Sequence, residues 1–158
     1  MYETMGIPRD LWERADDLWL RFNKEYPASL MTGAFETVRE LSDRHYLLGV
    51  VTSGSRSRVV REIEDHRLSN FFRVVVCNED TLQKKPSPEG LEKAMRALDR
   101  GPEFCCYVGD TPEDVQMGKD AQVTTFSVEG GYPRTCIGLN ASVHLPCISS
   151  LLSYLPPK

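Results

Sequence analysis

Short apolar runs alternate with helical segments along most of this chain, and this alternation constrains the fold more than any other feature. The apolar runs occupy residues 47–52, 72–77, 104–108 and 123–128. The first two lack polar alternation, which is typical of strands covered on both faces. Segments with helical periodicity follow at residues 57–68, 88–98 and 112–120. The pattern predicts βαβ units in an α/β, doubly wound parallel sheet, where ligands bind at the carboxyl ends of the strands.

Helical and extended segments are also expected outside this alternation. They lie at residues 8–26 (helix), 34–44 (helix), 142–145 (a weaker strand) and 148–155 (helix). The first of these helices has a broad apolar stripe, which Trp12 and Trp19 widen, so it must pack on another surface. Residues 27–33 form the only convincing linker.

Composition excludes several classes of function. The chain has 158 residues, of which 41% are hydrophobic, enough for one globular domain. Its net charge is −4 and no basic run exceeds Lys84-Lys85, which argues against nucleic acid and anionic membranes as partners. No apolar stretch approaches the roughly 20 residues of a membrane span, and the first residues lack the features of a secretory signal. Five cysteines without a Cys-x-x-Cys pair favour buried free thiols and a cytoplasmic protein.

The segment 108–118, Val-Gly-Asp-Thr-Pro-Glu-Asp-Val-Gln-Met-Gly, places two carboxylates after a predicted strand. Thr111 is expected to be a helix N-cap, with Pro112 at the first helical position and Asp114 closing a capping box. A well-made helix start would explain all of these residues except Asp110, which lies on the turn. Two carboxylates at the carboxyl end of a strand suit Mg²⁺, which prefers oxygen ligands.

Two other loops at strand ends carry groups that suit a phosphate. The first run is followed by Thr52, Ser53 and Gly54. The first two offer hydroxyls, the glycine allows close approach of the backbone, and the N-terminus of a helix comes next. Lys85 follows the second run, where Pro86 holds it extended as a point charge. Taken singly, an ordinary turn and a solvated lysine are equally good explanations. Because the fold brings the strand ends to one crevice, together they predict a site for a phosphate dianion beside Mg²⁺.

The order of these motifs resembles that of the haloacid dehalogenase-like hydrolases, and most closely their phosphoglycolate-phosphatase-like branch. The matching stretches are Val-Thr-Ser-Gly-Ser, Lys-Lys-Pro-Ser-Pro-Glu, Val-Gly-Asp-Thr-Pro-Glu-Asp and Gly-Gly-Tyr. The resemblance covers roughly residues 31–155. It implies a Rossmann-like α/β core over residues 31–158, a helical cap remnant over residues 1–30, and Mg²⁺-dependent hydrolysis of a small phosphorylated metabolite.

The resemblance also implies a role for each matching residue. Thr52 matches the phosphate-binding hydroxyl, with Ser53 where many members have asparagine. Lys85 matches the lysine that steadies the phosphoryl group during catalysis. Asp110 matches the Mg²⁺ ligand, and Asp114 matches the acidic residue that supports it at the metal site.

The chain departs from the family pattern in its nucleophile. Family members begin with an apolar strand ending in Asp-x-Asp, whose first aspartate attacks phosphorus and whose second acts as acid and base. None of the ten aspartates here forms that pair after a strand, and Asp16-Asp17 fall inside a predicted helix. We therefore expect an impaired or inactive hydrolase. The alternatives are a pseudo-enzyme that binds Mg²⁺ and a phosphometabolite without turnover, and a partial domain completed by a partner chain.

The missing strand has a structural consequence. In the family fold it lies mid-sheet, between the strand that ends at Thr52 and the strand that ends at Gly109. Without it, we predict that these two strands pair directly or that a segment from another chain fills the gap. Open edges and the apolar face around Trp12 and Trp19 also favour a homodimer. A two-component receiver domain is a rival interpretation, but its acceptor aspartate precedes the hydroxyl and the lysine, an order opposite to the one found here.

Overall fold

A computed structural model describes residues 6–25, 28–129 and 141–157. Its strands are β1 (Leu48–Val51), β2 (Phe72–Val76), β3 (Cys106–Gly109), β4 (Thr124–Val128) and β5 (Val143–Leu145). Its α-helices are α1 (Trp12–Glu25), α2 (Ala34–Asp43), α3 (Arg56–Asp65), α4 (Glu89–Leu98) and α5 (Pro112–Asp120). Short 3₁₀ segments are η1 (Arg9–Leu11), η2 (Asn78–Asp80), η3 (Pro102–Phe104) and η5 (Ile148–Ser153). The predicted alternation of strands and helices is confirmed, while the Gly130-Gly131-Tyr132 motif lies outside the described residues.

The strands form two parallel sheets instead of one. β1 pairs with β2, and β3, β4 and β5 form the second sheet in that order. The prediction that the strands ending at Thr52 and Gly109 pair directly is therefore wrong. Among the described residues, β1 and β3 each keep one edge without a strand partner. Filling of this gap by another chain stays a prediction.

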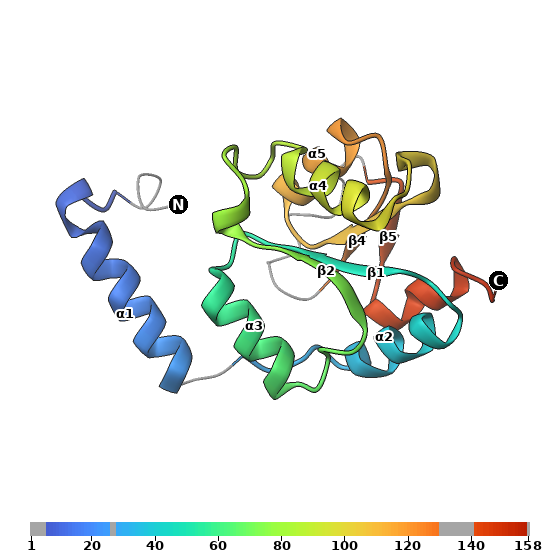
Figure 1. The fold of residues 1–158 in the computed structure, drawn as a ribbon, viewed down its shortest axis with the longest axis horizontal. Helices are drawn as coiled ribbons and strands as arrows, with labels where there is room; N and C mark the ends of the chain where they lie inside the picture. Colours follow the sequence, from blue (N-terminus) through green and yellow to red (C-terminus); the bar gives the residue numbers. More distant parts are fainter. Residues whose placement is uncertain (1–5, 26–27, 130–140, 158) are drawn as a thin grey trace.

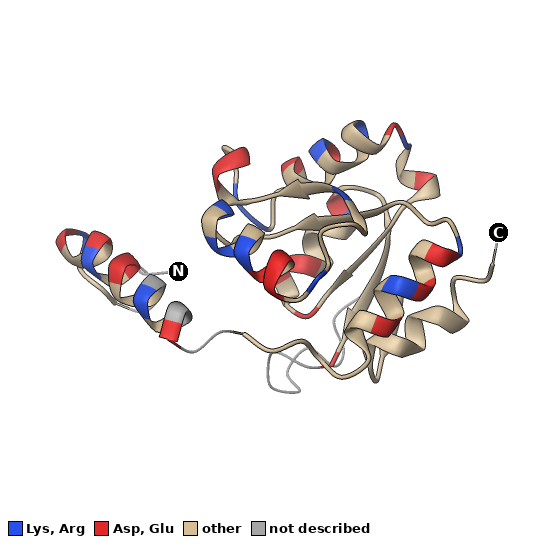
Figure 2. Cartoon of the chain, turned by 60° about the horizontal axis from the view of Figure 1, so that its bottom comes forward, with Lys and Arg blue, Asp and Glu red and all other residues tan. Residues whose placement is uncertain are grey.

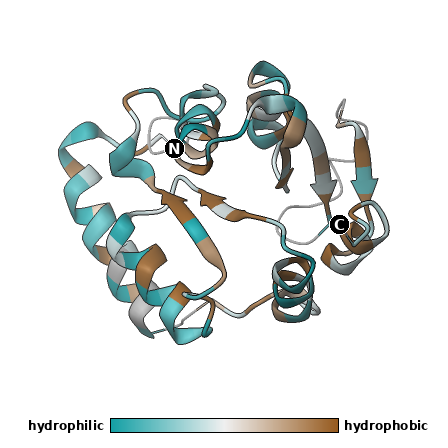
Figure 3. Ribbon diagram, turned by 45° about the vertical axis from the view of Figure 1, so that its right-hand side comes forward, coloured by the Kyte–Doolittle hydropathy of each residue, from teal (hydrophilic) through white to brown (hydrophobic). Residues whose placement is uncertain are grey.

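Helices cover both faces of the strands, as expected for a doubly wound fold. α4 and α5 lie on one side of β1 and β2, and α2 and α3 lie on the other (Figure 1). Hydrophobic residues lie along the strands with hydrophilic residues among them, and the helices likewise carry both kinds (Figure 3). One buried cluster contains Leu41, Phe126, Val128, Leu145 and Leu151, and the other contains Leu91, Met117, Ala121 and Val123. Each cluster joins at least one helix to the second sheet or to the residues that lead into it.

α1 stands apart from the α/β body (Figure 1). Acidic and basic residues are interspersed along it (Figure 2). Its apolar residues are largely exposed, with Leu18, Trp19 and Phe22 each more than half accessible. The predicted helix is confirmed, but the expected burial of its apolar face is not met within this chain. The division into a cap remnant and a core stays a prediction.

Three local expectations differ from the structure. Phe104 is 76% exposed and belongs to η3, so the strand begins at Cys106. The last predicted helix is the 3₁₀ segment η5. Of the four cysteines in the described residues, all free, Cys77 is buried but Cys106 and Cys147 are exposed, so the expectation of buried thiols holds only in part.

Among the described residues, no helix has the length and apolar character needed to cross a bilayer.

Gly118 fixes the approach of α5 to β4. A Cβ atom at this position would lie 2.1 Å from Thr125 Oγ1 and 3.1 Å from Thr125 Cβ. Gly118→Ala gains up to about 1 kcal/mol of helix propensity but overpacks the contact by about 1–3 kcal/mol. We therefore expect Gly118→Ala to lower the free energy of unfolding in urea by about 1 kcal/mol. Lys119→Ala, at an exposed position of the same helix, is the control, and an equally stable or more stable Gly118→Ala would contradict the packing argument.

Candidate phosphate-binding site

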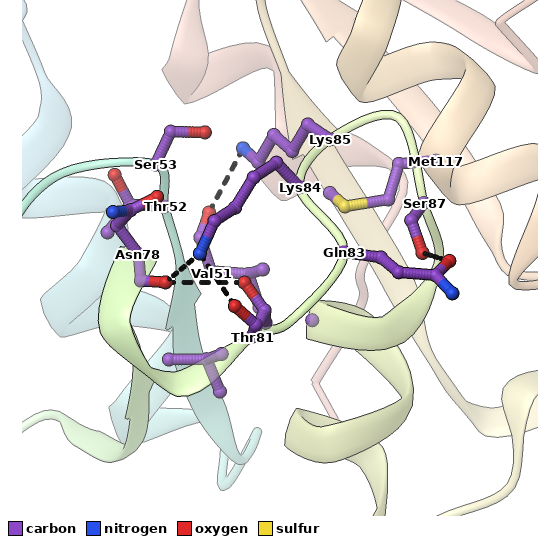
Figure 4. Close-up of a pocket in the computed structure, with 12 residues that line it drawn as sticks. Val51, Thr52, Ser53, Asn78, Thr81, Gln83, Lys84, Lys85, Ser87 and Met117 are labelled. Atoms are coloured by element: carbon purple, nitrogen blue, oxygen red, sulfur yellow. Dashed lines mark hydrogen bonds between the residues drawn. The ribbon is translucent and has the colours of Figure 1, made fainter.

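A pocket opens where β1, β2 and the loop before α4 come together (Figure 4). Three of the predicted phosphate-site residues, Thr52, Ser53 and Lys85, line it. Its remaining lining residues are Val51, Val76, Asn78, Thr81, Gln83, Lys84, Ser87, Gly90 and Met117. The fold therefore brings residues from two distant loops to one place, as the sequence predicts for the carboxyl ends of parallel strands.

Lys85 connects this pocket to the carboxylates at the end of β3. Its Nζ donates to Asp114 Oδ1 at 2.7 Å, to the Tyr107 hydroxyl at 2.9 Å and to the Val51 carbonyl at 3.2 Å. An ammonium group has three protons, so these contacts use all of them. To bind a phosphoryl oxygen, Lys85 must exchange one contact, and the longest is the one to Val51.

Asp114 is buried and accepts five hydrogen bonds. Oδ1 accepts from Lys85 and Tyr107, and Oδ2 accepts from the backbone amides of Asp110 and Thr111 and from the Thr111 hydroxyl. The predicted capping box between Thr111 and Asp114 is confirmed. Burial opposes ionisation of Asp114, but the Lys85 ammonium and the hydrogen bonds from Thr111 and Tyr107 outweigh it and hold the pKa of Asp114 below its usual range.

Asp110 lies on the turn after β3, partly buried. Burial and the negative charge of Asp114 raise the pKa of Asp110, and Lys85 partly offsets this effect. Mg²⁺ is commonly held by one or two carboxylates together with waters and substrate phosphates. Asp110 fits such a ligand. Asp114 does not fit a direct ligand as arranged, because hydrogen bonds occupy both of its oxygens, so it suits the supporting role. No cluster of three His, Cys, Asp or Glu side chains occurs in the described part of the chain.

The tip of β1 is arranged differently from the sequence expectation. Gly54 N donates to Thr52 Oγ1 at 3.0 Å, so this amide is already used, while the Thr52 O–H is left to donate. A Cβ atom on Gly54 would lie 2.3 Å from the Arg58 guanidinium and 2.8 Å from a Val59 methyl group, so a larger residue would have to displace these side chains. The first amide of α3, that of Arg56, is bonded to the carboxylate of Glu79. The helix N-terminus predicted to bind an anion therefore already faces one.

Two supporting residues escaped the sequence analysis. Tyr107 donates to Asp114 Oδ1 at 2.9 Å, and burial, then the charge of Asp114, raise its pKa. Glu89 accepts hydrogen bonds from the amides of Leu82 and Gln83, which anchors the loop that carries Lys85. Its hydrogen bond from Lys93 and these two amide bonds lower the pKa of Glu89 to about 2. Both residues stand in ordinary strand and helix patterns, so only the tertiary contacts reveal them.

Comparison with known proteins identifies the family of the chain. The model of the family described as haloacid dehalogenase-like hydrolase matches residues 2–128, most of the chain. The chain belongs to this family. The α/β fold with parallel strands, expected from the resemblance, is thus confirmed.

Curated relatives include pyrophosphatases named PpaX. The chain is 37% identical over 111 residues to PpaX of Bacillus cereus strain B4264, covering 68% of this chain and 51% of the relative. It is 40% identical over 94 residues to PpaX of strain G9842, covering 60% and 44%. The chain therefore spans about half the length of these relatives.

Solved structures share the fold. A predicted phosphoglycolate phosphatase from Haemophilus somnus superposes with a TM-score of 0.84 at 16% identity, over 98% of this chain and 72% of that one. CbbY from Rhodobacter sphaeroides, solved in complex with phosphate, gives a TM-score of 0.71 at 25% identity, over 77% of this chain and 56% of that one. A further CbbY structure contains xylulose-(1,5)bisphosphate. At 16% identity, the likeness to the Haemophilus somnus protein concerns the fold alone.

The Asp114 network should control stability as well as the position of Lys85. In Asp114→Asn, the amide nitrogen cannot accept hydrogen bonds, so donors from Lys85 or Thr111 lose their acceptor and the Lys85 charge loses its partner. We expect the free energy of unfolding to fall by about 2–4 kcal/mol. Denaturant unfolding measures this loss.

Asp120→Asn is a matched control for that substitution. Asp120 is exposed on the same helix, and among the described residues its carboxylate accepts a hydrogen bond only from the Gln116 side chain. We expect it to change stability by less than about 0.5 kcal/mol. Equal effects of the two substitutions would show that the buried network contributes no special stability.

Proposed function

We propose that this chain carries the phosphate- and magnesium-binding part of a haloacid dehalogenase-like phosphatase site. Its ligand is a small phosphorylated metabolite, and the chain as given binds this ligand with little or no turnover. The proposal rests on Lys85, which lines one pocket with Thr52 and Ser53 and contacts Asp114 outside that lining. The names of the PpaX and CbbY relatives, which refer to pyrophosphate, phosphate and a sugar bisphosphate, support this class of ligand.

Each group has a distinct task in this proposal. The hydroxyls of Thr52 and Ser53 donate to phosphoryl oxygens, and Lys85 supplies a positive charge once it gives up the Val51 carbonyl. Asp110 would hold Mg²⁺, which supplies charge stabilisation for the phosphoryl oxygens when bound. Asp114 keeps Lys85 and the turn at Asp110 in place. Hydrolysis by the family route needs an acceptor aspartate, and the sequence offers none after a strand, which supports binding without turnover.

Titration calorimetry with inorganic phosphate tests the proposal. We expect Mg²⁺ to raise phosphate affinity by roughly tenfold or more, because the cation neutralises Asp110 and attracts the dianion. Asp110→Asn should remove this dependence on Mg²⁺, whereas Glu113→Gln, at an exposed position on α5, should keep it. Absence of phosphate binding, or a Mg²⁺ effect that survives Asp110→Asn, would contradict the site. Rapid Mg²⁺-dependent hydrolysis of p-nitrophenyl phosphate would contradict the non-catalytic part.

A second candidate function rests on the gap between the two sheets. We propose that a strand from a partner chain pairs between β1 and β3 and supplies the missing aspartate. Thr52 N donates to Val76 O on β2 at 2.9 Å. Because a trans peptide directs its C=O opposite to the following N–H, the Val51 carbonyl points away from β2, toward β3. Only side chains, those of Lys85 and Tyr107, contact it among the described residues. A backbone acceptor at an open edge is what an added strand would use.

A synthetic peptide can supply such a strand. The peptide would have about five apolar residues, the usual strand length, followed by Asp-x-Asp. We expect it to bind and to produce Mg²⁺-dependent hydrolysis of p-nitrophenyl phosphate that the chain alone lacks, because the added aspartate acts as nucleophile. A matched peptide ending in Asn-x-Asn should bind without producing hydrolysis. If neither peptide binds at millimolar concentration, or if sedimentation shows that the chain closes the gap by dimerising, the peptide-strand proposal fails.

A further inference from the structure

We infer that Lys84 forms a second anion-binding position, so that the preferred ligand carries a second phosphate or carboxylate several bonds from its phosphoryl group. This inference rests on the proposed function, because it extends the ligand bound there. It concerns Lys84, a residue to which the sequence motifs assign no role. The argument compares two adjacent lysines that line the same pocket.

The two lysines differ in how their charges are balanced. The Lys85 ammonium forms an ion pair with Asp114 at 2.7 Å and has three acceptors. The Lys84 ammonium is bonded to two backbone carbonyls, Asn78 O at 2.5 Å and Thr81 O at 2.6 Å. It keeps one proton to donate. No carboxylate of the described residues forms an ion pair with it, so the uncompensated positive charge in the pocket belongs to Lys84.

The acidic residues closest to this loop are already engaged elsewhere. Glu89 binds the amides of Leu82 and Gln83 and forms an ion pair with Lys93 at 2.8 Å. Asp80 pairs with Arg56 and accepts from the amide of Cys77. These contacts fix the backbone that leads into Lys84. The Lys84 side chain is therefore held over the pocket by a loop that cannot neutralise it.

The position of Lys84 separates it from the metal side of the site. Asn78 and Thr81, which hold its ammonium, follow β2, whereas Asp110 follows β3. β1 and the unpaired gap lie between β2 and β3. Because neighbouring strands are about 4.8 Å apart, the ends of β2 and β3 are separated by on the order of 10 Å or more. Lys84 and Lys85 run side by side, with the Lys84 nitrogen directed toward Asn78 and Thr81 and the Lys85 nitrogen toward Val51 (Figure 4).

A phosphoryl group placed between Asp110 and Lys85 lies toward the β3 side of the site, whereas the Lys84 ammonium is held on its β2 side. A ligand that extends from that group toward β2 would bring a second anion to the exposed Lys84 ammonium. A charge-assisted contact of this kind favours a doubly anionic ligand over its singly phosphorylated counterpart. A phosphate and a carboxylate would both satisfy a point charge such as an ammonium group.

Calorimetric titration of the full chain with matched six-carbon ligands tests this inference. Fructose 1,6-bisphosphate carries a second phosphate and 6-phosphogluconate a carboxylate, whereas fructose 6-phosphate has neither. In Mg²⁺ at low ionic strength, we expect the chain to prefer at least one of the two doubly anionic ligands by roughly tenfold over fructose 6-phosphate. Comparison of the two shows which anion Lys84 favours. Lys84→Met should abolish the preference and leave the affinity for inorganic phosphate unchanged, and Lys119→Met, an exposed lysine on α5, should retain both.

Several results would overturn the inference. A wild-type chain without preference for either doubly anionic ligand does so directly. A Lys84→Met variant that weakens inorganic phosphate as much as fructose 1,6-bisphosphate shows that Lys84 serves the phosphoryl position itself. Both results leave phosphate binding by the wild-type chain intact and so leave the proposed function standing. If the wild-type chain does not bind inorganic phosphate, the proposed function and this inference both fail.

Discussion

The Lys85–Asp114 ion pair is the interaction on which the arrangement of the site depends. It joins the loop after β2 to the first turn of α5. The loop follows a strand of the first sheet, and the helix follows β3 of the second sheet. Burying two charges is costly unless hydrogen bonds satisfy their remaining atoms. Asp114 meets this condition with five hydrogen bonds and Lys85 with three acceptors. Because the pair is saturated, the two sheets keep a fixed relation at this edge although no backbone ladder connects β1 to β3.

The same contacts solve a problem created by the divided sheet. A strand edge without a neighbour leaves backbone groups that need partners. At the end of β1, Lys85 donates to the Val51 carbonyl at 3.2 Å, and the Tyr107 hydroxyl, whose proton goes to Asp114, lies 3.4 Å from that carbonyl. The Lys85 side chain therefore serves here as a substitute for a neighbouring strand. The position of Lys85 and the stability of the fold at this edge cannot be varied independently, since one set of hydrogen bonds provides both.

Local features of the structure follow from the sequence, whereas the contacts between distant loops do not. The Thr111–Asp114 capping box joins residues three positions apart, and β1 and β2 are short, mostly apolar runs, so both could be predicted from the local pattern. Tyr107 meets Lys85 across 22 residues and the Val51 carbonyl across 56, separations that leave no mark in the local pattern. The carboxylate of Glu79 on the first amide of α3 is a contact of the same kind. The division into two sheets was missed because strand periodicity indicates that a run is a strand but not which strand lies beside it.

The Val51 carbonyl also links the two parts of the proposed function. A strand that pairs at this edge would donate a backbone N–H to the carbonyl and so compete with Lys85 for it. Lys85 would then have a proton available for a phosphoryl oxygen while keeping Asp114 and Tyr107 as partners. If the strand raises the affinity of the Lys85 ammonium for a phosphoryl ligand, thermodynamic linkage requires that the ligand raise the affinity for the strand by the same factor. The open edge and the phosphate site are in this sense one structural unit, because both draw on the same three protons of Lys85.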